Sequence, residues 1–273
     1  MSPELKKRII TGVVGGAGFL ALLVFGGTIG IFLIVTLLSL AMVYEYAQMV
    51  FSMSDHAEKQ YLMLLLAWFI QIFYLLAPQT EYSMLIISFL FLFIYFLYTA
   101  KKYEERLLLK HITELAFSIF GLVYLVFVPQ YLRKIYELPQ GLKWTILFLV
   151  IVWSCDSGAY FAGMKYGKRK LYPEISPKKT VEGFAGGIGA ALVAAVIFRF
   201  SALQNVSIIG MILLTVCVGV VAQLGDLCES FLKRAFQVKD SGSLLPGHGG
   251  VLDRFDAIIF SVPVMYAGIR IFG

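Results

Sequence analysis

Residues 82–100 read YSMLIISFLFLFIYFLYTA, an uninterrupted apolar run without a single charged side chain. A helix of about 20 apolar residues is needed to cross the ~30 Å hydrocarbon layer of a bilayer, so this run predicts a transmembrane helix. The whole chain of 273 residues agrees with it, because 59% of the residues are hydrophobic and only 15% are charged. The mean hydropathy of +0.82 lies far outside the usage of soluble globular domains.

Similar apolar runs recur on both sides of this stretch, and the alternating pattern of an outer-membrane β-barrel does not occur. We therefore predict an all-α, polytopic integral membrane protein of about nine transmembrane helices. The first run follows Lys6, Lys7 and Arg8 like a signal peptide, but no small-residue cleavage site ahead of a soluble domain follows it. The predicted spans lie near residues 9–27, 29–49, 61–77, 82–100, 112–132, 143–163, 181–203, 206–225 and 251–272.

The distribution of Lys and Arg predicts the orientation, since cytoplasmic loops carry the excess of positive charge. With the N-terminus in the cytoplasm, the predicted outside keeps only Arg133, Lys134, Lys143, Arg199 and Arg270 of the 23 basic residues. We expect an N-in, C-out protein of the cytoplasmic (inner) membrane. The net charge of +6 is then a topology signal, and it does not indicate a nucleic-acid partner.

The two halves of the chain differ in polarity. We interpret residues 1–140 as a transmembrane scaffold of about five helices, in which Tyr44, Glu45 and Tyr46 serve as interfacial anchors. Residues 141–273 are predicted to form a catalytic transmembrane region of about four helices with cytoplasmic loops. The three cysteines, Cys155, Cys217 and Cys228, are too widely spaced for a disulfide framework or a zinc site, and we interpret them as packing residues.

Asp156 lies inside a predicted span, in the stretch VWSCDSGAYFAG at 152–163. A carboxylate at such a position costs about 2.5 to 3.5 kcal/mol on insertion scales. We expect its side chain to face a cavity, although a structural pair with a loop lysine is the alternative.

The loop before the seventh predicted span contains Ser176, Pro177, Lys178, Lys179 and Thr180. Ser176 or Thr180 can cap the following helix and Pro177 suits its first turn. Free backbone N–H groups there favour a phosphate, helped by Lys178 and Lys179. A solvated positive-inside loop accounts for the charges alone.

Glycines open the next helix, and Gly183 and Gly187 have the spacing of close helix packing. We favour packing over phosphate contact because the chain contains no G-x-x-x-x-G-K-[ST] loop. A P-loop ATPase is excluded by the same absence.

The densest polar stretch is QLGDLCESFLKRAFQVKDSGSLLPGHGGVLDRFD at 223–256. Asp226 and Glu229 are three residues apart, as are Asp253 and Asp256, so each pair shares one face of a helix. Carboxylate pairs of this kind suit one or two Mg²⁺ ions, whereas zinc would require His and Cys. An amphipathic helix on the inner surface is the alternative for residues 226–236.

The turn from Pro246 to Gly250 contains His248, which can contact a phosphate as readily as act as a general base. Gly249 and Gly250 allow a close approach of the backbone to a ligand. Lys233, Lys239 and Arg254 supply cations that can offset phosphate charge.

The pattern from Ser230 to Asp256, with Lys233-Arg234, Lys239-Asp240, Pro246-x-His248-Gly249-Gly250 and Asp253-Arg254-x-Asp256, resembles the signature of the phosphatidate cytidylyltransferase (CDP-diacylglycerol synthase) family. Residues 156–160, 176–183 and 225–230 are similar to other blocks of that family, so the resemblance covers about 150 to 260. It implies the reaction of CTP with phosphatidic acid to give CDP-diacylglycerol and pyrophosphate at the cytoplasmic leaflet, with Mg²⁺ required.

These observations combine into one hypothesis for the site. Metal ions are held by the acidic pairs, the lipid phosphate attacks the α-phosphorus of CTP in line, and Lys233 and His248 assist. Another CTP-dependent lipid transferase or kinase, or a secondary transporter, is the alternative function.

Small-residue faces at Gly12–Gly16 and Gly183–Gly187 lead us to expect a homo-oligomer. The predicted substrate-binding residues are Asp156, Ser176, Lys178, Lys179, Thr180, Lys239, Arg254, Gly249 and Gly250, and the predicted metal ligands are Asp226, Glu229, Asp253 and Asp256.

Overall fold

The structure, a computed structural model, describes residues 3–51, 57–101, 105–247 and 249–273. Within these residues, eight helical stretches are long and apolar enough to cross a membrane. The first predicted span corresponds to α1 (Pro3–Phe25), in which the described apolar part, Gly12–Phe25, is shorter than the other eight. The predicted all-α membrane fold is therefore confirmed.

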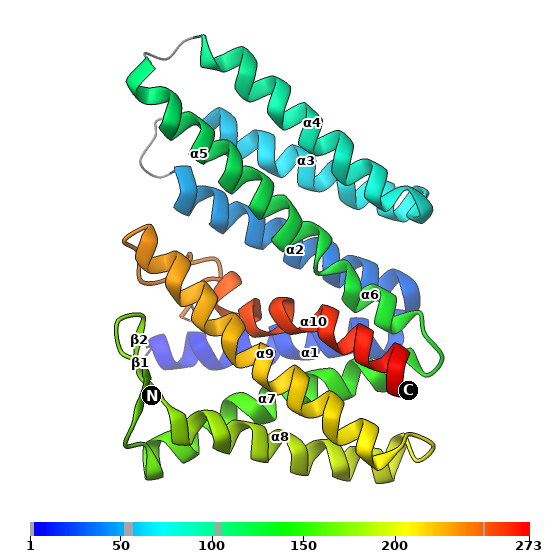
Figure 1. Cartoon of the computed structure of the whole chain (residues 1–273). Helices are drawn as coiled ribbons and strands as arrows, with labels where there is room; N and C mark the ends of the chain where they lie inside the picture. The colour runs from blue at the N-terminus through cyan, green and yellow to red at the C-terminus, as the bar shows by residue number, and fades with distance from the viewer. Residues whose placement is uncertain (1–2, 52–56, 102–104, 248) are drawn as a thin grey trace. The chain divides into compact units, whose positions relative to one another are not determined.

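The contacts between residues divide the chain into two compact units. Unit 1 comprises Met1–Gln130 and Asp240–Leu252, and unit 2 comprises Tyr131–Lys239 and Asp253–Gly273. The predicted division at residue 140 concerns roles, scaffold against catalysis, and it stays a prediction. The helical elements of unit 1 (Figure 1) are α1, α2 (Gly27–Phe51), α3 (Ala57–Leu76), η1 (Pro78–Thr80), α4 (Glu81–Ala100), α5 (Glu105–Leu122) and the π-helical turn η2 (Val123–Phe127).

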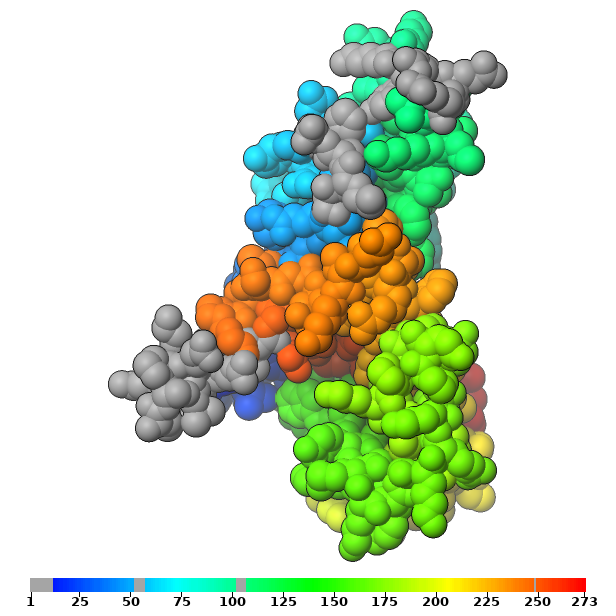
Figure 2. Space-filling view, turned by 90° about the vertical axis from the view of Figure 1, so that its left-hand side faces the viewer, coloured from blue at the N-terminus to red at the C-terminus, as the bar shows by residue number. Residues whose placement is uncertain are grey.

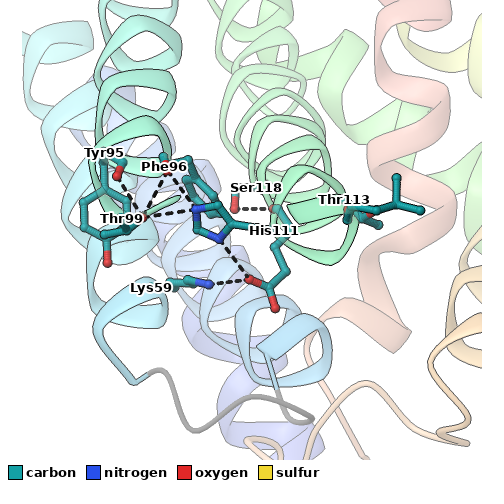
Figure 3. A network of polar contacts seen from close by, with 9 residues as sticks. Lys59, Tyr95, Phe96, Thr99, His111, Thr113 and Ser118 are labelled. Atoms are coloured by element: carbon teal, nitrogen blue, oxygen red, sulfur yellow. Dashed lines mark hydrogen bonds and ion pairs between the residues drawn. The ribbon is translucent and has the colours of Figure 1, made fainter. Parts of the chain in front are cut away.

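Unit 1 contains a buried polar network where α3, α4 and α5 pack together (Figure 3). Lys59 of α3 forms an ion pair with Glu114 of α5, and Nε2 of His111 lies 3.1 Å from Oγ1 of Thr99 and 2.8 Å from the carbonyl oxygen of Phe96. Lys59, His111 and Glu114 are all buried. Lys59, which the charge distribution assigned to a loop, is thus a packing residue in the first turn of a helix.

The fifth predicted span is not one regular helix. After α5, the N–H of Val128 donates to the carbonyl of Val123, which is the wider spacing of a π-helix. The chain continues into α6 (Gln130–Tyr136), where Nε2 of Gln130 donates to Oε1 of Gln71 in α3 at 2.9 Å. This hydrogen bond gives two buried amide side chains partners inside an apolar bundle.

Unit 2 contains α7 (Gly141–Tyr166), β1 (Lys170–Tyr172), β2 (Ser176–Thr180), α8 (Val181–Ala202), α9 (Ile208–Ala235) and α10 (Leu252–Phe272), apart from the first residue of α10. β1 and β2 form an antiparallel hairpin with Lys170 opposite Thr180. Ser176 and Pro177 therefore lie in a strand, and their predicted roles at the start of a helix are wrong. Thr180 is the N-cap, since its Oγ1 accepts the N–H of Gly183 at 3.1 Å.

Close packing of α7 against α8 depends on glycine, as predicted. A Cβ atom at Gly187 would lie 2.7 Å from the carbonyl oxygen of Cys155, and one at Gly183 would lie 2.8 Å from that of Ala159. Such distances are too short for real Cβ contacts, so only glycine permits this approach. Cys155 is buried in this packing, but Cys217 and Cys228 are exposed, so the packing interpretation is wrong for those two.

Helix α9 is longer than the span predicted at 206–225. It continues without a break to Ala235, so Asp226, Glu229 and Lys233 lie on one membrane-length helix. The alternative of a separate surface helix over 226–236 is wrong. Because α10 begins at Leu252, Asp253 and Asp256 occupy its first two turns, and both predicted acidic pairs are helical.

Candidate active site

The polar side chains of unit 2 gather at one end of its helices. The β1–β2 hairpin joins the C-terminal end of α7 to the N-terminal end of α8, and the C-terminal end of α9 lies at the same end (Figure 1). Figure 2 looks toward this end, with the yellow-green hairpin and the orange end of α9 on the surface. Two lysines, each paired with carboxylates, and a cavity organise the residues there.

Lys233 joins α9 to α10. Its Nζ lies 2.5 Å from Oε2 of Glu229, one turn earlier on α9, and 2.6 Å from Oδ1 of Asp253 on α10. The Glu229 side chain is only 1% exposed, and its Oε1 has no hydrogen-bond partner among the described residues. Lys233, predicted to assist at phosphates, is in this structure directed at two carboxylates.

Lys179 joins the hairpin to α9. Its Nζ lies 2.7 Å from Oδ2 of Asp226 and donates to the carbonyl oxygen of Gln223 at 3.4 Å. The side chains of Lys179 and Asp226 are 25% and 40% exposed. This pair is thus open enough for either group to meet another charged partner.

A cavity of about 400 Å³ adjoins this pair. Its polar lining includes Asp156, Lys178, Lys179, Thr180 and Asp226, which come from three separate sequence motifs. Asp156 interacts electrostatically with Asp226 and Lys179, and the expectation that it faces a cavity is confirmed. The rest of the wall is formed by residues such as Tyr160, Met164, Leu171 and Phe184, so the cavity combines charge with apolar surface.

Asp256 brings the second acidic pair toward the first. It is buried, its Oδ1 accepts the N–H of Ala257 at 2.7 Å, and it interacts electrostatically with Asp226 and Glu229. Among the described residues, no three His, Cys, Asp or Glu side chains are arranged to hold a metal ion. In this structure lysines pair with Asp226, Glu229 and Asp253, and Asp256 accepts a backbone N–H, so the four acids do not share a common centre.

The remaining predicted site residues lie elsewhere. Lys239 and Arg254 are exposed and are not among the residues that line this cavity. Gly249 and Gly250 belong to unit 1, where the N–H of Leu245 donates to the carbonyl of Gly249 at 3.1 Å. Gly249 has a φ of 85°, which only glycine adopts easily. His248 lies outside the described residues.

Two polar residues that position this end of unit 2 were missed as site residues by sequence reasoning. Oε2 of Glu182, in the first turn of α8, accepts the N–H groups of Lys168 at 3.0 Å and Arg169 at 3.1 Å, which fixes the start of the hairpin. Gln223 lines the cavity, and its Nε2 donates to the carbonyl of Phe184 at 3.1 Å. Neither residue has a spacing that reveals its role before the fold is known.

Glu45 is the most informative miss, and its interpretation as an interfacial anchor is wrong. Its side chain lies inside unit 1 with 0% exposure. It accepts hydrogen bonds from Ser241, Leu244 and Leu252, which follow it by about two hundred positions. A signal existed in the sequence, because a lone carboxylate inside an apolar span is costly and requires partners.

The chain matches the Cytidylyltransferase family over residues 6–272, and it belongs to that family. Among its relatives, a protein of Bacillus subtilis (strain 168) named phosphatidate cytidylyltransferase is 50% identical over 160 residues, which cover 58% of this chain and 60% of the relative. A protein of the same name from Staphylococcus haemolyticus (strain JCSC1435) is 46% identical over 126 residues, 46% of this chain and 48% of the relative. A third, from Staphylococcus saprophyticus, is 41% identical over 150 residues, with coverages of 55% and 57%. The aligned part thus spans about half to three fifths of these relatives.

Proposed function

We propose that the protein is a phosphatidate cytidylyltransferase, which transfers CMP from CTP to phosphatidic acid and releases pyrophosphate. The observation that carries the proposal is the cavity at the polar end of unit 2, where Asp156, Lys179 and Asp226 line one space. Family membership and the names of the relatives narrow the chemistry to cytidylyl transfer. The signature from Ser230 to Asp256 supports phosphatidic acid as the acceptor.

In the proposed reaction, a phosphate oxygen of phosphatidic acid forms a bond to the α-phosphorus of CTP. The bond from that phosphorus to the bridging oxygen breaks, and the electron pair leaves with pyrophosphate. No covalent enzyme intermediate is needed, since orientation and charge stabilisation carry transfers of this kind. Lys178 and Lys179 hold phosphate oxygens in the cavity, and the phosphate monoester is ionised enough to attack without a strong base.

We further propose that the reaction requires Mg²⁺. The residues fit this ion in chemistry, because carboxylate oxygens are its preferred protein ligands and a buried oxygen of Glu229 has no hydrogen-bond partner among the described residues. Asp226, Asp253, Asp256 and Glu229 are the residues that would hold it, and when bound it would neutralise charge on the transferred phosphate. In this structure Lys179 neutralises Asp226, and Lys233 bridges Glu229 and Asp253.

The proposed orientation has the N-terminus and the polar end of unit 2 on the cytoplasmic side of the inner membrane. The distribution of Lys and Arg supports it, and CTP is available on that side. Phosphatidic acid then enters from the lipid, guided by the apolar wall of the cavity at Tyr160, Met164 and Phe184. The homo-oligomer expected from the small-residue faces stays a prediction.

The test is direct. Purified protein in lipid nanodiscs is incubated with CTP carrying a labelled α-phosphorus, phosphatidic acid and Mg²⁺, and label is followed into a lipid product. We expect labelled CDP-diacylglycerol with stoichiometric pyrophosphate, and loss of the product in excess EDTA. A parallel reaction with CTP labelled at the γ-phosphorus and a polyprenol as acceptor tests the kinase alternative, since a kinase transfers the terminal phosphate and leaves the α-phosphorus in CDP. If neither the α-label nor the γ-label enters a lipid with any acceptor, the proposed function is wrong and a secondary transporter is the better explanation.

A further inference from the structure

The segment from Asp240 to Leu252 connects α9 to α10, and it contains little regular secondary structure. Its described part has one isolated bridge, between Leu245 and Gly249. A connection of this kind must obtain partners for its backbone N–H groups from outside itself. In unit 1 the carboxylate of Glu45, near the end of α2, accepts two of these N–H groups, those of Leu244 and Leu252.

Both oxygens of Glu45 are used. Oε2 accepts the N–H of Leu252 at 3.0 Å and the hydroxyl of Ser241 at 3.4 Å, and Oε1 accepts the N–H of Leu244 at 3.4 Å. The three donors are spread over the beginning, middle and end of the segment. Because the carboxylate is fully enclosed, these hydrogen bonds are what make its burial tolerable.

The contact with Leu252 has a second consequence. Leu252 is the first residue of α10, so its N–H is one of those that have no acceptor within the helix. A carboxylate at this end also interacts favourably with the helix dipole. Glu45 therefore fixes the point at which α10 begins, and Asp253 is the next residue along the chain.

Gly242 shows how closely this carboxylate fits. A Cβ atom at residue 242 would collide with Oε1, Cδ and Cγ of Glu45. Any side chain at that position must displace the carboxylate or the segment. Glycine at residue 242 is therefore required for this position of the Glu45 carboxylate.

We propose that Glu45 is a positioning residue for cytidylyl transfer: it holds the 240–252 segment and sets the start of α10, and through it the positions of Asp253 and Asp256. This inference rests on the proposed function. Asp253 contacts Lys233 at 2.6 Å, so a shift in the first turn of α10 would loosen that pair. Glu45 acts through these residues and does not itself touch the reacting phosphates.

The first test is Glu45→Gln, which keeps the size of the side chain and replaces one acceptor oxygen with an NH₂ donor facing N–H and O–H donors. We expect kcat to fall about 10- to 100-fold, the range for a misplacement of about 1 Å, while KM for CTP changes less than about threefold because the cavity residues are intact. Hydrogen exchange followed by mass spectrometry should show faster exchange in peptides that cover residues 240–252. Glu58→Gln, an exposed residue in the first turn of α3, is the matched control with wild-type kinetics.

The second test leaves the carboxylate in place. Gly242→Ala should lower kcat about tenfold by displacing Glu45, and it should raise exchange in the same peptides. Gly189→Ala is the matched control, because a Cβ atom there has nothing within 4 Å. Ser241→Ala, which removes one of the three donors, should have the smallest effect.

The outcomes separate this inference from the proposed function. If wild-type protein forms no CDP-lipid, the function is wrong, while the exchange measurements still decide whether Glu45 holds the segment. If wild-type protein is active and both Glu45→Gln and Gly242→Ala keep its kcat, the positioning role is wrong. A lowered unfolding temperature with kcat unchanged per folded molecule would also overturn it, since that result describes a purely structural contact.

Discussion

Lysine–carboxylate pairs occur in both units, and they differ in their access to solvent. In unit 1 the side chains of Lys59 and Glu114 are 3% and 10% exposed, whereas in unit 2 those of Lys179 and Asp226 are 25% and 40% exposed. The enclosed pair is a fixed part of helix packing, and its charges cannot meet a substrate. The open pair lines a cavity and can exchange its partner for a phosphate or a cation. Accessibility, more than the presence of charge, therefore distinguishes the candidate site from the scaffold.

Lys233 has a solvent exposure between those of the lysines in the enclosed and the open pair. Its side chain is 13% exposed and is shared between Glu229 and Asp253, so it lies between Lys59 at 3% and Lys179 at 25%. Yet it lies at the polar end of unit 2 and joins the two helices that carry the acidic pairs. An enclosed pair at the polar end of unit 2 can serve both packing and chemistry, and substitutions can separate the two contributions.

The largest effect on turnover is expected from Asp256→Asn. The substitution preserves shape at a buried position but removes a negative charge from the acidic group that includes Asp226 and Glu229. Loss of one electrostatic contact to the transition state typically lowers kcat about 10²- to 10³-fold, and we expect that range in the labelled-CTP assay. Glu174→Gln, an exposed change in the turn of the hairpin, should leave activity intact. Activity of Asp256→Asn within a few-fold of wild type would contradict the role of the acidic group.

A smaller loss of activity should follow from Lys179→Met, which removes the cation of the solvent-accessible pair. The variant removes the partner of Asp226 and one phosphate contact in the proposed complex. A hydrogen bond to a charged group contributes about 1.5 to 3 kcal/mol, so kcat/KM for CTP should fall roughly 10- to 100-fold. Lys170→Met, in β1 of the same hairpin, is the matched control. Equal effects of the two variants would mean that general surface charge, and not the open pair, attracts the nucleotide.

Much of the fold was predictable, because the period and length of apolar runs report directly on helices that cross a bilayer. The acidic pairs were also predictable, since a spacing of three puts Asp226 with Glu229 and Asp253 with Asp256 once each segment is helical. What the sequence could not reveal is which cation each carboxylate meets. The contacts of Lys179 with Asp226 and of Lys233 with Asp253 depend on the packing of different helices, and local spacing carries no information about that.

The errors have similar physical causes. Ser176 and Pro177 satisfy the preferences of a helix start, but the backbone pairs with Lys170–Tyr172 in a hairpin, and only Thr180 caps the helix. The place of Glu45 near the end of a span favours an interfacial anchor, whereas its hydrogen-bond donors lie in residues 240–252. Contacts between residues so far apart in the chain are set by the tertiary fold.

Thr180→Ala should have a modest effect that tests how firmly the open pair is held. It removes the side-chain acceptor for the N–H of Gly183, a loss of about 0.5 to 2 kcal/mol at a helix N-cap. Because Lys179 is the preceding residue, we expect turnover to fall about two- to fivefold together with a lower unfolding temperature. Thr180→Ser keeps the hydroxyl and should recover both. Failure of serine to recover stability would show that the methyl group of Thr180, and not the cap, is what matters.

The smallest effect on turnover is expected from a substitution in the enclosed pair of unit 1. This substitution tests directly whether solvent access distinguishes the candidate site from the scaffold. Glu114→Gln removes the charge that Lys59 meets in the network of Figure 3. Breaking a buried pair typically costs about 3 to 5 kcal/mol, so the unfolding temperature in detergent should fall clearly. Turnover per folded molecule should stay within about twofold of wild type, because the pair is shut off from solvent and substrate. The double variant Lys59→Met with Glu114→Leu replaces both charges by apolar groups and should recover most of the stability, as it does for other buried pairs. If instead Glu114→Gln lowers kcat as strongly as Lys179→Met while the protein stays folded, the enclosed pair takes part in the reaction, and solvent access does not separate the scaffold from the site.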